Sequence, residues 1–274
     1  MMDSTQLPGE RSSAPASVLD VVPPAQIAQL VENVGVKKAN LSTVQTLTLG
    51  ILAGAFIAFG AMFYTLVVTD STLGFGPTRL LGGLAFSLGL ILVIIGGAEL
   101  FTGNSLILLA WMDRRISTTA LMRNWSLVYV GNLIGALGTA VLVQLSGPHD
   151  LNGGAIVETA QAIAQAKVSL EPLPAFARGV LCNTLVCLGV WMCFAAHTVT
   201  GKVVVILFPV TAFVALGFEH SVANMYLIAI AAFQPHSDIG VVAFLGNLVP
   251  VTIGNIVGGG VLVAATYSLV YLRK

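Results

Sequence analysis

Charge is scarce in this chain. Only 9% of its 274 residues are charged, its basic and acidic side chains cancel to a net charge of +0, and 56% of its residues are hydrophobic. Together with a mean hydropathy of +0.92, this composition predicts an all-α integral membrane protein, because a soluble domain needs a more charged surface. No basic stripe is interleaved with aromatic residues, which argues against nucleic acid as a partner.

Cysteine and histidine are also few. The three cysteines fall within one apolar run and the four histidines are scattered, so we predict neither a metal site nor a cofactor. The sequence has no phosphate-binding G-x4-G-K-[ST] loop and no second cluster of catalytic residue types. We therefore expect that the protein is not an enzyme.

Long apolar runs are what the chain has in quantity. A membrane-spanning helix needs about 20 apolar residues, and six runs qualify: Val44 to Val68, Leu80 to Trp111, Leu121 to Leu145, Phe176 to Ala196, Val203 to Phe233 and Ile239 to Leu272. The second and fifth runs are too long for one crossing and carry polar residues in their middles. We predict six spans, of which the second and fifth are broken.

The distribution of basic residues predicts the orientation. Nine of the twelve lie on one side: Arg11, Lys37, Lys38, Arg114, Arg115, Arg123, Lys202, Arg273 and Lys274. By the positive-inside rule both termini are then cytoplasmic, in a multi-pass protein of the cytoplasmic (inner) membrane. Residues 1–40 are predicted to form a cytoplasmic tail, in which "PPAQIAQLVENVGVKKA" is typical of an amphipathic helix. Residues 41–274 form the predicted transmembrane domain.

The two broken runs resemble each other. "GAELFTGN" contains Glu99 and Asn104, and "GFEHSVAN" contains Glu219 and Asn224 at the same spacing. The runs that follow also match, with "GNLIG" in the third and "GNIVG" in the sixth. Three spans per half place the halves in opposite orientations, so the sequence predicts two inverted three-helix repeats.

Breaks at membrane depth favour a small anion. The freed backbone groups are tolerated only inside protein or beside a water-lined cavity, and each half-helix directs a partly positive N-terminus toward the centre. We expect Glu99 and Glu219 to stabilise the break loops by accepting hydrogen bonds from exposed N–H groups, as a capping carboxylate does. Asn104 and Asn224 are assigned to the same loop-stabilising set.

His220 is the residue that breaks the match between the repeats, because its counterpart is Leu100. An imidazole changes charge near neutral pH, and burial favours its neutral form. The anion of a weak acid can hydrogen-bond to a neutral imidazole, or exchange a proton with it and cross as the uncharged acid. We therefore assign the proton chemistry to His220.

"GGAELFTGNSL", "ALGFEHSVANMY" and "GVLCNTLVCLGVWM" resemble signature segments of the formate/nitrite transporter family, and the resemblance runs from about Pro23 onward. It implies an aquaporin-like fold, one pore in each protomer and a homopentamer in the lipid bilayer.

The resemblance also implies roles for single residues. His220, Thr102 and Asn183 would form the central pore site, and Lys167 would raise the local anion concentration in the outer vestibule. The apolar pore constrictions would be formed by Phe86 and Phe213 toward the outside, and by Leu90, Leu100, Phe101 and Val186 toward the cytoplasm.

Three functions remain open at this stage. The first is a proton-linked channel or transporter for a small weak-acid anion: formate first, with nitrite, hydrosulfide or lactate as alternatives. The second is a neutral-solute pore like an aquaporin, which the missing Asn-Pro-Ala motif disfavours. The third is an intramembrane enzyme that uses His220 and Glu219 as acid and base.

Overall fold

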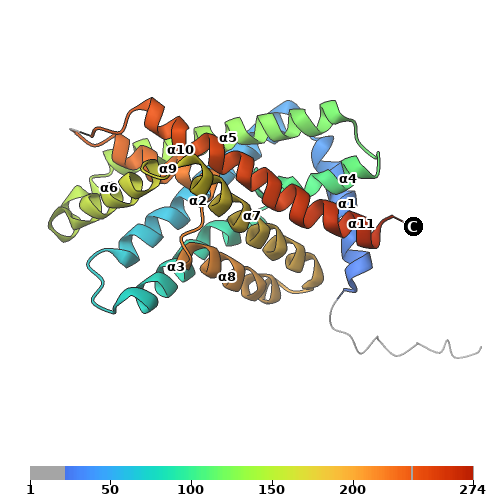
Figure 1. The fold of residues 1–274 in the computed structure, drawn as a ribbon, viewed down its shortest axis with the longest axis horizontal. Coiled ribbons are helices and arrows are strands. Elements are labelled where there is room, and N and C mark those ends of the chain that lie inside the picture. The colour runs from blue at the N-terminus through green and yellow to red at the C-terminus, as the bar shows by residue number, and fades with distance from the viewer. Residues whose placement is uncertain (1–21, 236, 274) are drawn as a thin grey trace, which may run out of the picture.

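The computed structural model describes residues 22–235 and 237–273, so the expected tail lies outside it up to residue 21. The described part of the chain is all-helical (Figure 1). Five of its helices are long and apolar enough to cross a membrane: Thr43–Val68, Phe75–Gly96, Thr118–Leu145, Pro172–Ala195 and Val241–Tyr271. The protein is a multi-pass membrane protein.

Both long polar-centred runs are interrupted. The first consists of α3 (Phe75–Gly96), a loop, the short 3-10 helix η1 (Gly103–Ile107) and α4 (Leu108–Met112). The second consists of α8 (Val199–Ala215), a loop and α9 (Ser221–Ala232). The loops of the two breaks, residues 97–102 and 216–220, each begin with or contain a glycine at positive φ, Gly97 and Gly217, a conformation that disfavours other side chains.

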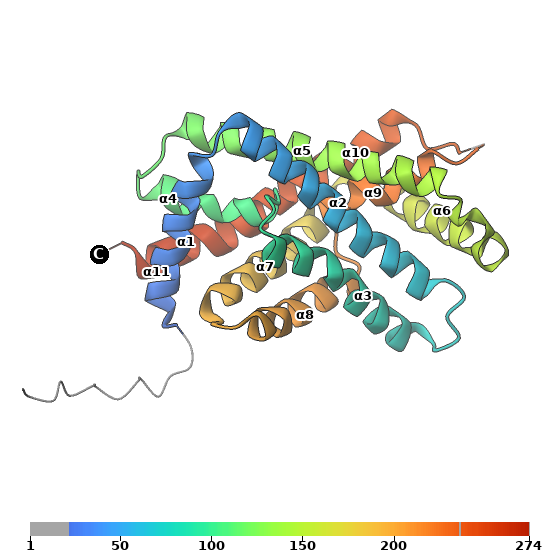
Figure 2. The same ribbon diagram turned by 180° about the vertical axis from the view of Figure 1, so that it is seen from behind.

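The uninterrupted helices surround these breaks. They are α2 (Thr43–Val68), α5 (Thr118–Leu145), α7 (Pro172–Ala195) and the last span, which runs through α10 (Val241–Ile256), the π-helical turn η3 (Val257–Ala265) and α11 (Thr266–Tyr271). α2 packs against α3 and α5, and α7 packs against α8 and α10. Figure 2 shows α2, α3 and α5 from behind.

Glycine allows the closest of these contacts. A Cβ atom at Gly135 of α5 would overlap the carbonyl oxygen of Ile51 in α2, and one at Gly254 of α10 would overlap that of Phe176 in α7. These helices therefore approach each other until their backbones touch, as small-residue seams permit in membranes.

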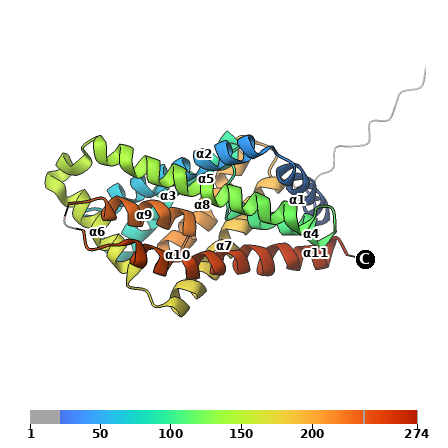
Figure 3. The same cartoon turned by 90° about the horizontal axis from the view of Figure 1, so that it is seen from above.

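Two shorter helices lie at opposite ends of the bundle (Figure 3). α1 (Pro24–Ala39) is the amphipathic helix that the sequence predicts, and it buries Ile27, Ala28 and Val31 against the transmembrane helices near α4 and α11. α6 (Ala155–Val168) follows η2 (Pro148–Gly154) and packs against α9. None of the six predicted spans covers this second segment, and its helix was not predicted.

Candidate functional site

The first break is held by an asparagine from the neighbouring helix. The Asn132 side chain accepts a hydrogen bond from the Phe101 N–H (2.9 Å) and donates to the carbonyl oxygens of Glu99 (2.9 Å) and Gly50 (2.8 Å). Asn132 is fully buried. Its amide thus satisfies the backbone groups that the interruption frees, which is the condition for irregular backbone at this depth.

The second break has the same arrangement. Asn255 accepts from the Ser221 N–H (2.9 Å) and donates to the carbonyl oxygens of Glu219 (2.9 Å) and Gly179 (2.9 Å). Asn132 and Asn255 belong to the matching segments "GNLIG" and "GNIVG". The sequence match therefore marks the residues that support the two breaks, although it did not reveal how they act.

Each break also holds a buried carboxylate against a lysine. Lys167 Nζ lies 2.9 Å from Glu219 Oε1, and Asn224 donates to Glu219 Oε2 (2.6 Å). Lys38 Nζ lies 2.9 Å from Glu99 Oε1, and Asn104 donates to Glu99 Oε2 (2.7 Å). One lysine ends α1 and the other ends α6, so the two peripheral helices supply equivalent cations to the two breaks.

A second pair of asparagines completes both clusters. Asn124 accepts from Asn104 (3.0 Å) and donates to the carbonyl oxygen of Lys38 (3.2 Å). Asn247 accepts from Asn224 (2.7 Å) and donates to the carbonyl oxygen of Lys167 (2.8 Å).

The donors to Glu99 and Glu219 differ from those that we expected. Backbone N–H groups of the breaks were the predicted donors, whereas the hydrogen bonds recorded for the described residues come from asparagine and lysine side chains. The physical reason is that the amides of Asn132 and Asn255 already bond the break backbone. The carboxylates thus bind lysines of α1 and α6 and asparagines of η1, α9 and α10 rather than capping a helix.

His220 and Thr102 bring the two breaks into contact. His220 Nε2 lies 3.0 Å from Thr102 Oγ1, and His220 Nδ1 accepts the Ala223 N–H at 3.1 Å as the N-cap of α9. Because Nδ1 accepts, a neutral ring carries its proton on Nε2 and donates it to the Thr102 hydroxyl. Both side chains are almost fully buried.

Asn183 ties this contact to the surrounding helices. Its amide nitrogen lies 3.1 Å from the carbonyl oxygen of Thr102, 3.1 Å from Ser105 Oγ and 2.7 Å from the carbonyl oxygen of Asn255. Asn183 is fully buried. It therefore bridges helices next to the central pair, in the group to which the resemblance assigned it.

Two phenylalanines lie beside His220, on the side of Lys167. The rings of Phe86 and Phe213 are edge-to-face with centroids 5.7 Å apart, and the Phe213 ring stacks nearly parallel to the imidazole at 5.8 Å. Phe86, Phe213 and His220 all line a cavity of about 200 Å³. The same cavity is lined by three cations, Arg79, Lys167 and Arg178, and one carboxylate, Glu219.

A second hollow approaches from the opposite side. A cavity of about 270 Å³ is lined by Lys38, Lys202 and Glu99, and a smaller one of about 50 Å³ beside it is lined by Leu90 and Leu100. These two leucines therefore lie on the Lys38 side of the central pair. Cations outnumber carboxylates in the charged lining on both sides, which favours an anion.

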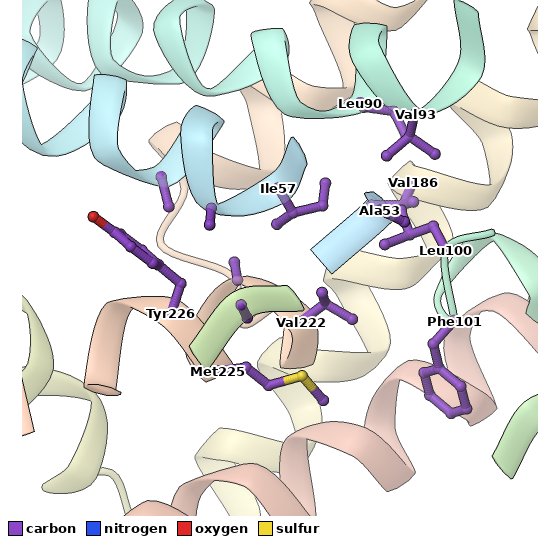
Figure 4. Close-up of a cluster of buried hydrophobic side chains, with 14 of the residues drawn as sticks. Ala53, Ile57, Leu90, Val93, Leu100, Phe101, Val186, Val222, Met225 and Tyr226 are labelled. Carbon is purple, nitrogen blue, oxygen red and sulfur yellow. The ribbon is translucent and has the colours of Figure 1, made fainter. Parts of the chain in front are cut away.

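Phe101, also predicted as an inner constriction residue, takes a different position. Phe101 packs edge-to-face against Tyr129 (4.8 Å between centroids) and Trp125 (6.3 Å), and in Figure 4 its ring points away from Leu90 and Val186. Val186 is buried in the same hydrophobic cluster as Leu90 and Leu100.

Comparison with known proteins agrees with this geometry. The family model described as "Formate/nitrite transporter" matches residues 25–269. The chain belongs to the formate/nitrite transporter family. It is 40% identical to the formate channel FocA of Escherichia coli, over 93% of this chain and 96% of that protein. It is also 39% identical to a probable formate transporter of Methanothermobacter thermautotrophicus, over 92% and 97% of the two chains.

Solved structures give the same result. A pentameric formate channel with formate bound is 42% identical and superposes with a TM-score of 0.77, covering 84% of this chain and 98% of that one. An ion channel of the same family is 29% identical, with a TM-score of 0.82 over 91% of this chain and 99% of that one.

Sequence reasoning missed several residues of the two clusters. Lys38 was read only as a basic residue for orientation, and Asn124 and Asn247 were not singled out. A signal for Lys38 does exist: it precedes Gly50 by twelve residues, just as Lys167 precedes Gly179 by twelve. Because both glycines supply carbonyl oxygens to the break asparagines, this shared spacing pairs the two lysines.

Proposed function

We propose that this protein is a channel for small monovalent anions of weak acids, with formate as the main substrate and His220 linking passage to a proton. The observation that carries the proposal is the contact between His220 Nε2 and Thr102 Oγ1, which lies between the outer and inner cavities. The relatives named as formate channels support the choice of formate. Nitrite, hydrosulfide and lactate are the alternatives within the same family.

The outer cavity would raise the local concentration of the anion and remove part of its hydration shell. Lys167 attracts the anion into the hollow that it lines together with Arg79 and Arg178. Phe86 and Phe213 then form a narrow apolar slit, which a hydrated ion crosses only at a high cost. An anion that loses its charge by gaining a proton avoids that cost.

The central pair would supply hydrogen bonds at the point of least hydration. The Nε2–H of His220 is a donor, and the Thr102 hydroxyl, which accepts from it, keeps its own hydrogen free to donate. Proton transfer from His220 to formate would require the ring to gain a proton at Nδ1 first and lose its bond to the Ala223 N–H. The Nε2 proton could then move to a formate oxygen, which leaves formic acid and a neutral ring that keeps, on Nδ1, the proton taken up from solution.

The proposal also covers the spans, the repeats and the orientation of the chain in the membrane. We assign six spans in two inverted repeats, with α1 and α6 as equivalent peripheral helices, because both breaks carry the same bonds to lysine and asparagine. We propose that residues 1–40 form a cytoplasmic segment whose helix α1 covers the inner cavity, and that residues 41–274 form the channel domain. Both termini would face the cytoplasm, in the cytoplasmic membrane.

The protein would assemble as a homopentamer with one pore in each protomer. The pentameric state of the formate channel that this chain resembles supports this assignment. The exposed apolar side chains of the bundle, such as Phe208 and Val242, would then contact lipid or a neighbouring protomer.

The test is a flux assay in proteoliposomes. Wild-type protein should take up formate faster when the outside is acidic, and formate, nitrite, lactate and hydrosulfide in competition should rank the substrates. His220→Phe and His220→Asn should change the rate or its pH dependence, whereas His197→Asn, at an exposed position, should change neither. Unaltered flux and pH response in the His220 variants would contradict the role of His220.

Two further outcomes would favour other functions. Swelling of the vesicles with glycerol in the absence of anion flux would indicate a neutral-solute pore. Turnover of an added compound without transport would indicate an enzyme, for which His220 and Glu219 are the acid and base to test.

A further inference from the structure

The size of the outer slit depends on how α3 and α8 lie against each other. Phe86 is on α3 and Phe213 is on α8, and their ring centroids are 5.7 Å apart. The two helices run side by side (Figures 1 and 2). A small rotation or slide of one helix past the other would therefore change the width of the slit directly.

Arg79 joins the two helices close to this point. Its Nε donates to the carbonyl oxygen of Ala215 (2.9 Å), its Nη2 donates to that of Val214 (2.9 Å), and its Nη1 reaches the Tyr64 hydroxyl (3.3 Å). Val214 and Ala215 directly follow Phe213 in the chain. Arg79 precedes Phe86 by seven residues, so the two side chains leave α3 on the same face, two turns apart.

The bond to Ala215 meets a need of the helix end. The last carbonyl groups of a helix have no partner within it, and those of Ala212, Phe213 and Val214 accept N–H groups of the following loop. Among the described residues, the recorded partner of the Ala215 carbonyl is Arg79. A positive charge at this position also complements the negative end of the helix dipole.

Gly83 provides a fixed point between the arginine and the phenylalanine. A Cβ atom there would lie 2.7 Å from the carbonyl oxygen of Thr211, so α3 and α8 touch through their backbones one turn from Arg79. With the helices in contact at Gly83, the bonds of Arg79 decide where the outer end of α8, and with it Phe213, comes to rest.

We propose that Arg79 is a positioning residue that sets the width of the outer slit, and thereby the size of anion that the channel admits. The inference rests on the proposed function as an anion channel. Any cation that lines the cavity contributes to electrostatic attraction of an anion. The role proposed for Arg79 is different, because it requires the planar guanidinium, which bonds two carbonyl groups at once.

Arg178 offers a matched control. It lines the same cavity as Arg79 and carries the same charge. Within the described part of the chain its guanidinium makes no recorded hydrogen bond to α8. Replacing Arg178 therefore removes a cation from the vestibule and leaves the end of α8 in place.

The experiment compares R79Q, R79K and R178Q with wild type in proteoliposomes, with formate and the larger acetate and lactate as substrates, at low and at physiological salt. R79Q and R79K should both raise the acetate-to-formate rate ratio, by about tenfold, the range that one methyl group commonly decides. R178Q should lower all rates together, more at low salt, with the ratio unchanged. Elution of each variant at the wild-type size verifies assembly.

A wild-type ratio in R79K, or the same ratio in R79Q and R178Q, would overturn the proposal and leave Arg79 with a charge effect alone. The proposed function is judged separately, by wild-type formate flux in the same vesicles. A structure of R79Q in nanodiscs gives a readout that needs no transport. The Phe86 and Phe213 rings should move apart from their 5.7 Å separation, and an unchanged separation would also overturn the proposal.

Discussion

Replacing Asn255 with alanine is the most direct test of how the breaks are held. The substitution removes three hydrogen bonds, to the Ser221 N–H and to the carbonyl oxygens of Glu219 and Gly179, from a fully buried side chain. A hydrogen bond contributes a net of about 1 kcal/mol in proteins, and about 0.6 kcal/mol between membrane helices. The expected loss of unfolding free energy is therefore about 2 to 3 kcal/mol.

The assay is reversible unfolding in mixed micelles by titration with sodium dodecyl sulfate, followed by tryptophan fluorescence. Asn132→Ala breaks the equivalent three bonds in the first break and should cost the same amount within about 0.5 kcal/mol, a typical error for such comparisons. Gln161→Ala, at an exposed position of α6, should change the free energy by less than about 0.5 kcal/mol.

Asn255→Ala and Asn132→Ala should differ in transport, although they should lose similar amounts of stability. Asn255 bonds the N–H of the residue that follows His220, whereas Asn132 bonds the N–H of the residue that follows Leu100. Formate flux and its pH dependence should therefore fall further in Asn255→Ala than in Asn132→Ala. A stability loss near zero in Asn255→Ala, or a loss several times that of Asn132→Ala, would refute the view that one device supports both breaks.

Two other predictions follow from single contacts. Thr102→Val removes the acceptor of the His220 Nε2–H and should slow formate flux by about five- to tenfold, the equivalent of a hydrogen bond worth roughly 1 kcal/mol. Thr102→Ser keeps a hydroxyl, so its formate flux should stay near that of wild type. Equal rates in the two variants would count against the contact. Burial raises the pKa of the Glu32 carboxyl on α1 above 4.5, so protonation favours the docked helix and its stabilisation is lost as pH rises through the raised pKa. Hydrogen-exchange protection of α1 should fall over that pH range in wild type but not in Glu32→Gln, and a parallel fall in both would refute the assignment.

The spans and breaks could be predicted because they depend on local properties. A helix that crosses a bilayer needs a certain length of apolar sequence, and the polar interruptions at Glu99 and Glu219 stand out against it. The helix α1 was likewise predictable, since its start after Pro23 and its apolar spacing are both local.

The partners of the two carboxylates could not be predicted in this way. Lys38 is far from Glu99 in the sequence, and only the packing of α1 beneath η1 and α4 brings them within 2.9 Å. The bond of Arg79 to Ala215 joins positions 136 residues apart. Contacts of this kind depend on how the helices cross, which composition and periodicity do not specify.

The two breaks share their supporting residues and differ at the residues of the central contact. Glu, Asn and Lys recur in both because each break must satisfy the same freed backbone groups and the same buried carboxylate. His220 corresponds to Leu100, and Thr102 corresponds to Val222, so each polar residue of the central contact has an apolar counterpart in the other repeat. The repeated residues thus support the backbone of both breaks. The two unmatched polar residues, Thr102 and His220, lie 3.0 Å apart. Since the bonds of the support do not include that contact, we propose that it serves the solute.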